Sequence, residues 1–193
     1  NFNYKAEANF NPFYSKLEGS VKEINILYLI NSNNLILQLL KTEILNNKNL
    51  NFDLNIHGNK IKDFSDFADI KLNLKIQEGL IDIDDTEFSW KKNVNFFLKD
   101  SLIYVKDGEL ILDGKFNLNF KNYDEIYKFL ITPKKYRKEL TNIKADFVYN
   151  FDQKIVNFDN ILINNKSNKE LNQILERLTF KKNKLQNKVY IKN

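Results

Sequence analysis

Apolar and polar residues alternate in short runs along most of this chain, and tight turns separate the runs. The clearest run is Glu109–Phe120, which follows an Asp107-Gly108 pair suited to a hairpin turn because both residues tolerate a positive φ. Side chains of a strand point alternately to its two faces, so a period of two predicts a half-buried strand. One face of this strand is expected to carry Leu110, Leu112, Phe116, Leu118 and Phe120.

Other strands are predicted on the same grounds. They fall at 2–10, 16–23, 50–56, 68–76, 80–84, 86–90, 94–98, 102–106, 143–151 and 155–163, with a last short strand at 189–191. The segment 79–120 is predicted to be an antiparallel meander, and His57-Gly58-Asn59 a turn. The uniformly apolar segment 24–30 is read as strand or turn. Leu72, Leu74 and Ile76 are expected to share the face of Leu110, with Lys71, Lys75 and Lys115 on the opposite face.

Three segments change to helical spacing. The first is about 33–45, the second begins after Asn122 and continues at 133–140 beyond the break at Thr132-Pro133, and the third follows the Ser167/Glu170 capping box. The fold class predicted from these patterns is mainly β (β-rich α+β): a large antiparallel curled sheet of hairpins with about three amphipathic helices.

Length and composition are consistent with one unit. The 193 residues form a single predicted β-rich segment, 1–193, with no Pro- or Ser-rich linker. The chain contains no Met, even at position 1, which we interpret as the mark of a segment cut from a longer protein. No apolar run approaches the roughly 20 residues that span a bilayer, so any membrane anchor is expected to lie outside this segment.

The net charge of +5 does not by itself indicate a nucleic-acid partner. The positive charges are spread along the chain, and the one basic cluster, at 177–192, has no aromatic RNA-recognition motif beside it. We interpret this cluster as a solvated tail and predict no nucleic-acid binding. The absence of Cys excludes disulfides, thiolate metal sites and Cys nucleophiles.

Candidate chemistry is sparse. His57 is the only imidazole, so a Ser-His-Asp triad would have to include it, and its place beside Gly58 favours a surface position. Asp82, Asp84, Asp85 and Glu87 resemble the start of a calcium loop, but the Gly and the bidentate Glu that such a loop needs are missing. No Gly-rich phosphate loop is present. We therefore predict no enzyme activity, no cofactor and no metal.

The segments Gly79–Trp90 (GLIDIDDTEFSW) and Val105–Gly114 (VKDGELILDG) resemble the AsmA-like proteins, and the similarity of strand rhythm spans roughly 50–165. The resemblance implies a protein of the Gram-negative cell envelope, anchored in the inner membrane by an N-terminal helix, with a long curled β-sheet in the periplasm. It also implies phospholipid transport towards the outer membrane and a part in outer-membrane assembly. No catalytic residue follows from the resemblance.

Two functional hypotheses remain open. In the first, the apolar sheet face is a groove that binds phospholipid acyl chains, with Phe52, Leu54, Leu72, Leu74, Leu112 and Phe116 as the candidate groove residues. In the second, the helices close over that face, and the segment is a structural or interaction domain with no lipid ligand. The amphipathic helices that interrupt the strands distinguish this chain from an uninterrupted AsmA-like sheet.

Overall fold

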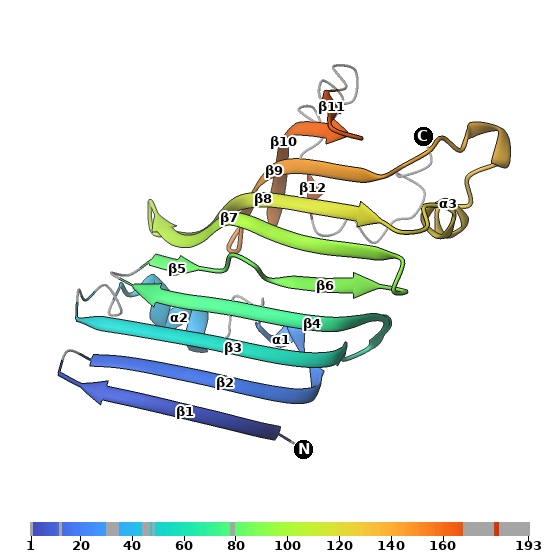
Figure 1. Cartoon of the computed structure of the whole chain (residues 1–193). Helices are drawn as coiled ribbons and strands as arrows, with labels where there is room; N and C mark the ends of the chain where they lie inside the picture. Colours follow the sequence, from blue (N-terminus) through green and yellow to red (C-terminus); the bar gives the residue numbers. More distant parts are fainter. Residues whose placement is uncertain are drawn as a thin grey trace.

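The computed structural model describes residues 2–11, 13–29, 35–43, 47, 49–77, 80–167 and 180–181. All twelve strands found in these residues belong to one sheet (Figure 1). The strands are β1 (Phe2–Phe10), β2 (Phe13–Ile24), β3 (Leu50–Ile61), β4 (Phe64–Gln77), β5 (Leu80–Asp82), β6 (Glu87–Trp90), β7 (Val94–Lys106), β8 (Glu109–Phe120), β9 (Asn142–Asn150), β10 (Ile155–Ile163), β11 (Lys166–Ser167) and β12 (Phe180–Lys181). The mainly β class is thereby confirmed.

The helices are few and short. They are α1 (Ile26–Leu29), α2 (Leu35–Lys41), α3 (Asp124–Phe129) and a 3₁₀ turn, η1 (Lys134–Tyr136). In Figure 1, α1 and α2 lie behind β3 and β4, while α3 lies at one end of β8. The third helix and the short strand predicted near the C-terminus, after residue 167 and at 189–191, lie outside the described residues.

The strand order is β1-β2-β3-β4-β5-β7-β8-β9-β10-β11, with β6 beside β4 and β7, and β12 beside β10. One pair departs from the expected antiparallel pattern, because β2 and β3 are parallel. Parallel neighbours need a connection that leaves the plane of the sheet and returns. The segment carrying α1 and α2 makes that connection, so the two helices are placed against one face.

Cross-strand neighbours confirm the predicted faces. A row of paired residues runs Ile76–Ile81–Ile103–Leu112 across β4, β5, β7 and β8. The apolar residues of β4 and those of β8 therefore lie on the same side of the sheet. Directly opposed residues of neighbouring strands share a face. We call this side the apolar face. The opposite side, the polar face, carries the predicted lysines Lys71, Lys75 and Lys115.

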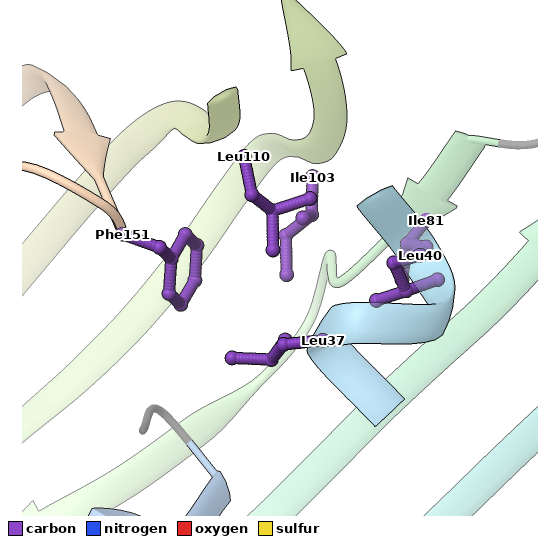
Figure 2. Packing of buried hydrophobic residues seen from close by; sticks show 6 residues of the cluster. All are labelled: Leu37, Leu40, Ile81, Ile103, Leu110 and Phe151. Carbon is purple, nitrogen blue, oxygen red and sulfur yellow. The ribbon is translucent and has the colours of Figure 1, made fainter. Parts of the chain in front are cut away.

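The main core lies between α2 and the apolar face. Leu37 and Leu40 project from α2 towards buried residues of β5, β7, β8 and the turn after β9 (Figure 2). These partners are Ile81, Ile103, Leu110 and Phe151. A second, smaller cluster forms near α1 from Ile24, Ile61 and Ile70. The helices thus cover the middle of the apolar face.

The polar stretch 99–101 does not divide two strands, as the sequence suggested, but forms a bulge within β7. Asp100 adopts a positive φ of 48°, and the fully buried Ser101 is pressed against Gly114 of β8. A Cβ on Gly114 would lie 2.2 Å from Ser101 Oγ and 2.9 Å from its Cα. The bulge therefore requires glycine at position 114.

The turn predicted at His57-Gly58-Asn59 is wrong, because β3 continues through it to Ile61. Gly58 does not form a turn but lets the Ile24 side chain pack closely against the backbone of β3. A Cβ at position 58 would lie 2.5 Å from Ile24 Cδ1. The segment expected to be strand or turn at 24–30 contains α1. The predicted helical continuation at 133–140 is only the single turn η1, which ends where Arg137 adopts an extended backbone with φ −75° and ψ 125°.

Candidate functional site

The six groove residues predicted from the sequence all lie on the apolar face. Phe52 and Leu54 of β3 stand opposite Ile76 and Leu74 of β4, and Leu72 follows on the same side. The paired row through Ile76, Ile81, Ile103 and Leu112 brings β8 into the same surface, and Phe116 lies farther along it. All six side chains are half-buried.

These six residues have different surroundings on the apolar face. Leu74 and Leu112 pack against the cluster formed with α2, and Leu72 packs against the cluster near α1. Phe116 lies apart from both clusters, with its ring centroid 6.2 Å from that of Phe147 and 5.5 Å from that of Phe158. The helices therefore cover part of the surface that the sequence indicated as a groove.

An open apolar hollow of about 590 Å³ lies on the same face, towards α3. Its floor consists of two cross-strand rows, Val94–Phe120 and Phe96–Leu118–Ile143. Its walls are the turn between β3 and β4 with the start of β4, Trp90, and α3; their lining residues are Asp63, Phe64, Ser65, Asp66, Phe67, Ile126 and Phe129. We call this the α3 hollow.

Aromatic contacts hold the walls of the α3 hollow. The Trp90 ring contacts the ring of Phe129 in α3 edge to face, with ring centroids 5.4 Å apart. The ring centroids of Phe67 and Phe96 are 6.1 Å apart. At the rim, Lys91 Nζ lies 5.0 Å from the centre of the Trp90 ring and 3.8 Å from Asp66 Oδ2. The hollow thus combines an apolar interior with charged groups of both signs at its edge.

A second hollow of about 650 Å³ adjoins the first. Ile126 and Ile143 line both, so α3 stands between them. The second hollow also includes Tyr127, Leu130, Leu140 and Ile163, together with the polar residues Tyr136, Lys138, Glu139, Asn164, Lys166 and Ser167. Together the two hollows extend the open part of the apolar face across β7, β8, β9 and β10.

The segment 128–138, which we call the α3 loop, exposes apolar and basic side chains together. Its exposed apolar residues are Phe129 (55%), Leu130 (37%), Ile131 (71%) and Tyr136 (62%), and its exposed basic residues are Lys128, Lys134, Lys135 and Lys138. Arg137 is half-buried and pairs with Asp124 at 3.4 Å. Exposed apolar groups gathered among polar ones are typical of surfaces that bind another protein, a membrane or a ligand.

Hydrogen bonds fix the shape of the α3 loop. Arg137 Nε donates to Thr132 O at 3.0 Å, and the Tyr127 hydroxyl donates to Lys138 O at 2.9 Å. Ile131 has a φ of 57°, a strained value for a β-branched residue. At the end of α3, Lys128 Nζ donates to Glu125 at 2.7 Å, and this bond holds the pKa of the Glu125 carboxyl below its usual value.

Asp82, at the end of β5, and Asp84, in the turn after it, accept local backbone hydrogen bonds. Asp82 accepts the Asp84 backbone N–H at 2.7 Å, and Asp84 accepts that of Ser101 at 2.5 Å. His57 is exposed on β3, opposite Lys71. Within the described ranges, no group of three or more His, Cys, Asp or Glu side chains could hold a metal ion. None of the helices described has the length and apolar character needed to span a bilayer.

Sequence reasoning missed both the α3 hollow and the α3 loop. The loop has a signal in the sequence, FLITPKKYRK at 129–138, in which an apolar run precedes four cations. The hollow has none, because its lining comes from five separate parts of the chain. Comparison with protein-family models, curated proteins and solved structures found no match to this chain.

Proposed function

We propose that this chain is a non-catalytic lipid-handling segment whose α3 hollow binds phospholipid acyl chains. The observation that carries the proposal is the open apolar floor of the hollow, in which Phe96, Leu118 and Ile143 stand side by side. An acyl chain lying on this floor would remove apolar surface from water on both partners, worth roughly 25 cal/mol per Å². Each buried methylene would contribute about 0.8 kcal/mol.

The α3 loop supports a phospholipid over a neutral apolar ligand. Phe129 both lines the hollow and is exposed on the loop, so the acyl site lies next to the cationic surface. Phosphate groups are bound well by Lys and Arg side chains. We infer that the loop rests at an anionic lipid interface while an acyl chain enters beside α3.

The cellular setting belongs to the same proposal. The strand rhythm shared with AsmA-like proteins over 50–165 supports a place in the periplasm, with a membrane anchor outside this segment and acyl chains moving towards the outer membrane. On this proposal the partners are phospholipid and membrane, with no nucleic acid, and the segment acts without a cofactor.

The single tryptophan gives a direct test of acyl-chain binding. Trp90 lines the α3 hollow and is only 6% exposed. A brominated fatty acid or phospholipid bound there should quench its fluorescence with a saturable dependence on concentration. Leu118 lies in the middle of the floor. Leu118→Lys should raise the apparent dissociation constant measured by this quenching at least tenfold, because a cation would replace an apolar contact. A tenfold change corresponds to a loss of about 1.4 kcal/mol in binding free energy.

Val148→Lys is the matched control. Val148 is 38% exposed on the polar face, opposite Asp113, so a lysine there should leave quenching at the wild-type level. Circular dichroism should show that both variants remain folded, since a lysine in an open hollow can reach water. Wild-type protein without saturable quenching would refute the acyl site. Unfolding of Leu118→Lys alone would support the closed-core alternative.

A second experiment tests the α3 loop. Ile131→Asp should reduce co-sedimentation with vesicles containing about 30% phosphatidylglycerol several-fold, because it replaces the most exposed apolar group of the loop with an anion. Binding should fall for wild type when the anionic lipid is omitted. Leu80→Asp, at an exposed residue of β5, is the control. Equal vesicle binding by the two variants would contradict the proposed role of the loop.

One observation favours the alternative of a structural domain. The packing of α2 on Leu74 and Leu112 shows that part of the apolar face is a closed core. If the α3 hollow binds no acyl chain, the role of the helices is to cover the sheet and form this core. The sheet edges are then the surfaces at which a partner could bind by strand addition. The quenching experiment separates the two functions.

A further inference from the structure

Strand β1 is the outermost strand of the sheet at its N-terminal side (Figure 1). It pairs with β2 over its whole length, from Phe2 to Phe10, and with no other strand of the described residues. Residues 3–10 are all exposed, including Phe10 at 82%. A long, exposed edge strand presents a row of backbone donors and acceptors that can pair with another strand.

The sequence of β1, FNYKAEANF, is nearly self-complementary. If two copies pair antiparallel about Ala6, Phe2 lies opposite Phe10, Asn3 opposite Asn9, and Tyr4 opposite Ala8. Lys5 of each copy then lies opposite Glu7 of the other. A two-fold interface uses the same patch on both copies, so this is the complementarity that such an interface requires.

The charges of β2 extend the match. Within one copy, Lys5 lies opposite Glu18 in the register of the two strands, and Glu7 lies opposite Lys16. The ion pairs inside the copy run along each strand, from Lys5 to Glu7 at 2.8 Å and from Lys16 to Glu18 at 2.6 Å. Antiparallel pairing about Ala6 would therefore create two rows that cross the interface, each with the order Glu18, Lys5, Glu7, Lys16. The first two residues of a row come from one copy and the last two from the other. Charges alternate along each row, and directly opposed unlike charges stabilise a sheet.

We propose that β1 is a homodimerisation edge, at which two copies of this chain join antiparallel about Ala6 to form one continuous sheet. The register is selected by charge. Moving the centre of pairing to Lys5 would set Lys5 against itself, and moving it to Glu7 would set Glu7 against itself. Like charges directly opposed destabilise a sheet, so both neighbouring registers are disfavoured. The interface is independent of the α3 hollow and does not rest on the proposed function.

Single and mixed charge reversals test this interface. Lys5→Glu sets Glu against Glu in the homodimer, and Glu7→Lys sets Lys against Lys. Each variant should raise the dimer dissociation constant about tenfold or more, measured by sedimentation equilibrium of the 193-residue chain. An equimolar mixture of the two variants should restore dimers, because each pair is again Lys opposite Glu. A fluorophore on one variant identifies the mixed species.

The mixture also controls for effects within each copy, since both reversals place like charges across β1 and β2. Lys22→Glu is the control for net charge, because Lys22 is exposed on β2 beyond the residues that pair with β1. It should dimerise like wild type. A wild-type chain that stays monomeric up to hundreds of micromolar would overturn the proposal. Failure of the mixture to restore dimers would overturn it equally.

Discussion

Replacing Leu110 by alanine should lower the free energy of unfolding by about 2 to 5 kcal/mol, the range expected for a fully buried leucine. Leu110 is 1% exposed and lies in the cluster that joins α2 to the sheet, near Ile103 and Phe151 (Figure 2). Truncation removes three carbon atoms and leaves a cavity that strands fixed by cross-strand pairing cannot easily fill. The loss should appear in urea unfolding as a lower midpoint with an unchanged slope.

Leu80→Ala is the matched control, because the Leu80 residue is 47% exposed on β5 and should change stability by less than about 0.5 kcal/mol. Leu40→Ala tests the helix side of the same core. Since Leu40 and Leu110 belong to one cluster, the double variant should not show the sum of the two single losses. Strict additivity, or a loss at Leu110 no larger than at Leu80, would mean that α2 is not seated on the sheet.

The period of two in the sequence was sufficient to predict the faces of the sheet. A one-residue change of register moves every side chain of a strand to the other face of the sheet. A strand with one apolar side is therefore restricted to registers that bury that side. This is why Leu74 and Leu112, which lie far apart in the chain, were correctly assigned to the same face. The pattern did not determine which strands would be neighbours, because local periodicity does not record the partner of a strand. The parallel pair β2–β3 was missed for that reason.

Polar residues inside strands caused the local errors. Asp100 and Ser101 break the alternation of β7, and a break in alternation is equally consistent with a turn or a bulge. The His57-Gly58-Asn59 stretch has the composition of a turn, yet Gly58 is needed where Ile24 approaches the backbone of β3. In both cases the deciding contact comes from a residue distant in sequence, Gly114 or Ile24, which local reading cannot supply.

The candidate site was predictable as a face but not as a hollow. The six groove residues share the predicted face, but α2 covers two of them. The α3 hollow exists because α3 and the turn before β4 form its walls beside the sheet. Their positions depend on tertiary contacts such as that of Trp90 with Phe129. The sequence therefore predicted where apolar surface would lie, while the packing of short helices determined which part of it stays open.

Asp152 fastens the turn between β9 and β10 to both β8 and α2. One carboxylate oxygen accepts the Leu110 backbone N–H at 3.0 Å, and the other accepts a hydrogen bond from Lys41 at the end of α2. The neighbouring Phe151 contributes its ring to the main core. The side chain of Asp152 is only 25% exposed, so water replaces these partners poorly. The carboxylate is therefore a polar anchor for the same core that Leu110 fills.

Asp152→Ala should lower the free energy of unfolding by about 1.5 to 3 kcal/mol, because it leaves the N–H of the buried Leu110 without its acceptor and Lys41 without its counter-charge. Lys115→Ala is the contrasting variant. Its pair with Asp100, at 2.6 Å, has both side chains more than half exposed, so its loss should leave stability unchanged within error. Equal losses in the two variants would contradict the anchoring role of Asp152.

The Asp152 contribution should also depend on pH in one direction. Partial burial alone would raise the pKa of the Asp152 carboxyl, but the hydrogen bonds from Lys41 and Leu110 and the charge of Lys41 outweigh it and hold the pKa below its usual value. The folded state thus binds this proton less readily than the unfolded state. The stabilisation is complete above the ordinary carboxyl pKa of about 3.9 and is lost as the pH falls through the lower, folded value.

Urea unfolding of wild type and Asp152→Ala at a series of pH values measures this dependence. The difference in stability between them should be constant from about pH 7 down to pH 5 and should shrink below about pH 4. At low pH, protonation of Asp152 removes from the wild type the stabilisation by the carboxylate, which Asp152→Ala lacks at every pH. Other carboxyl groups titrate in both proteins, so only the difference reports on Asp152. A difference that grew on acidification would mean that the folded protein favours the protonated carboxyl, and the anchor would then be a neutral hydrogen bond instead of an ion pair with Lys41.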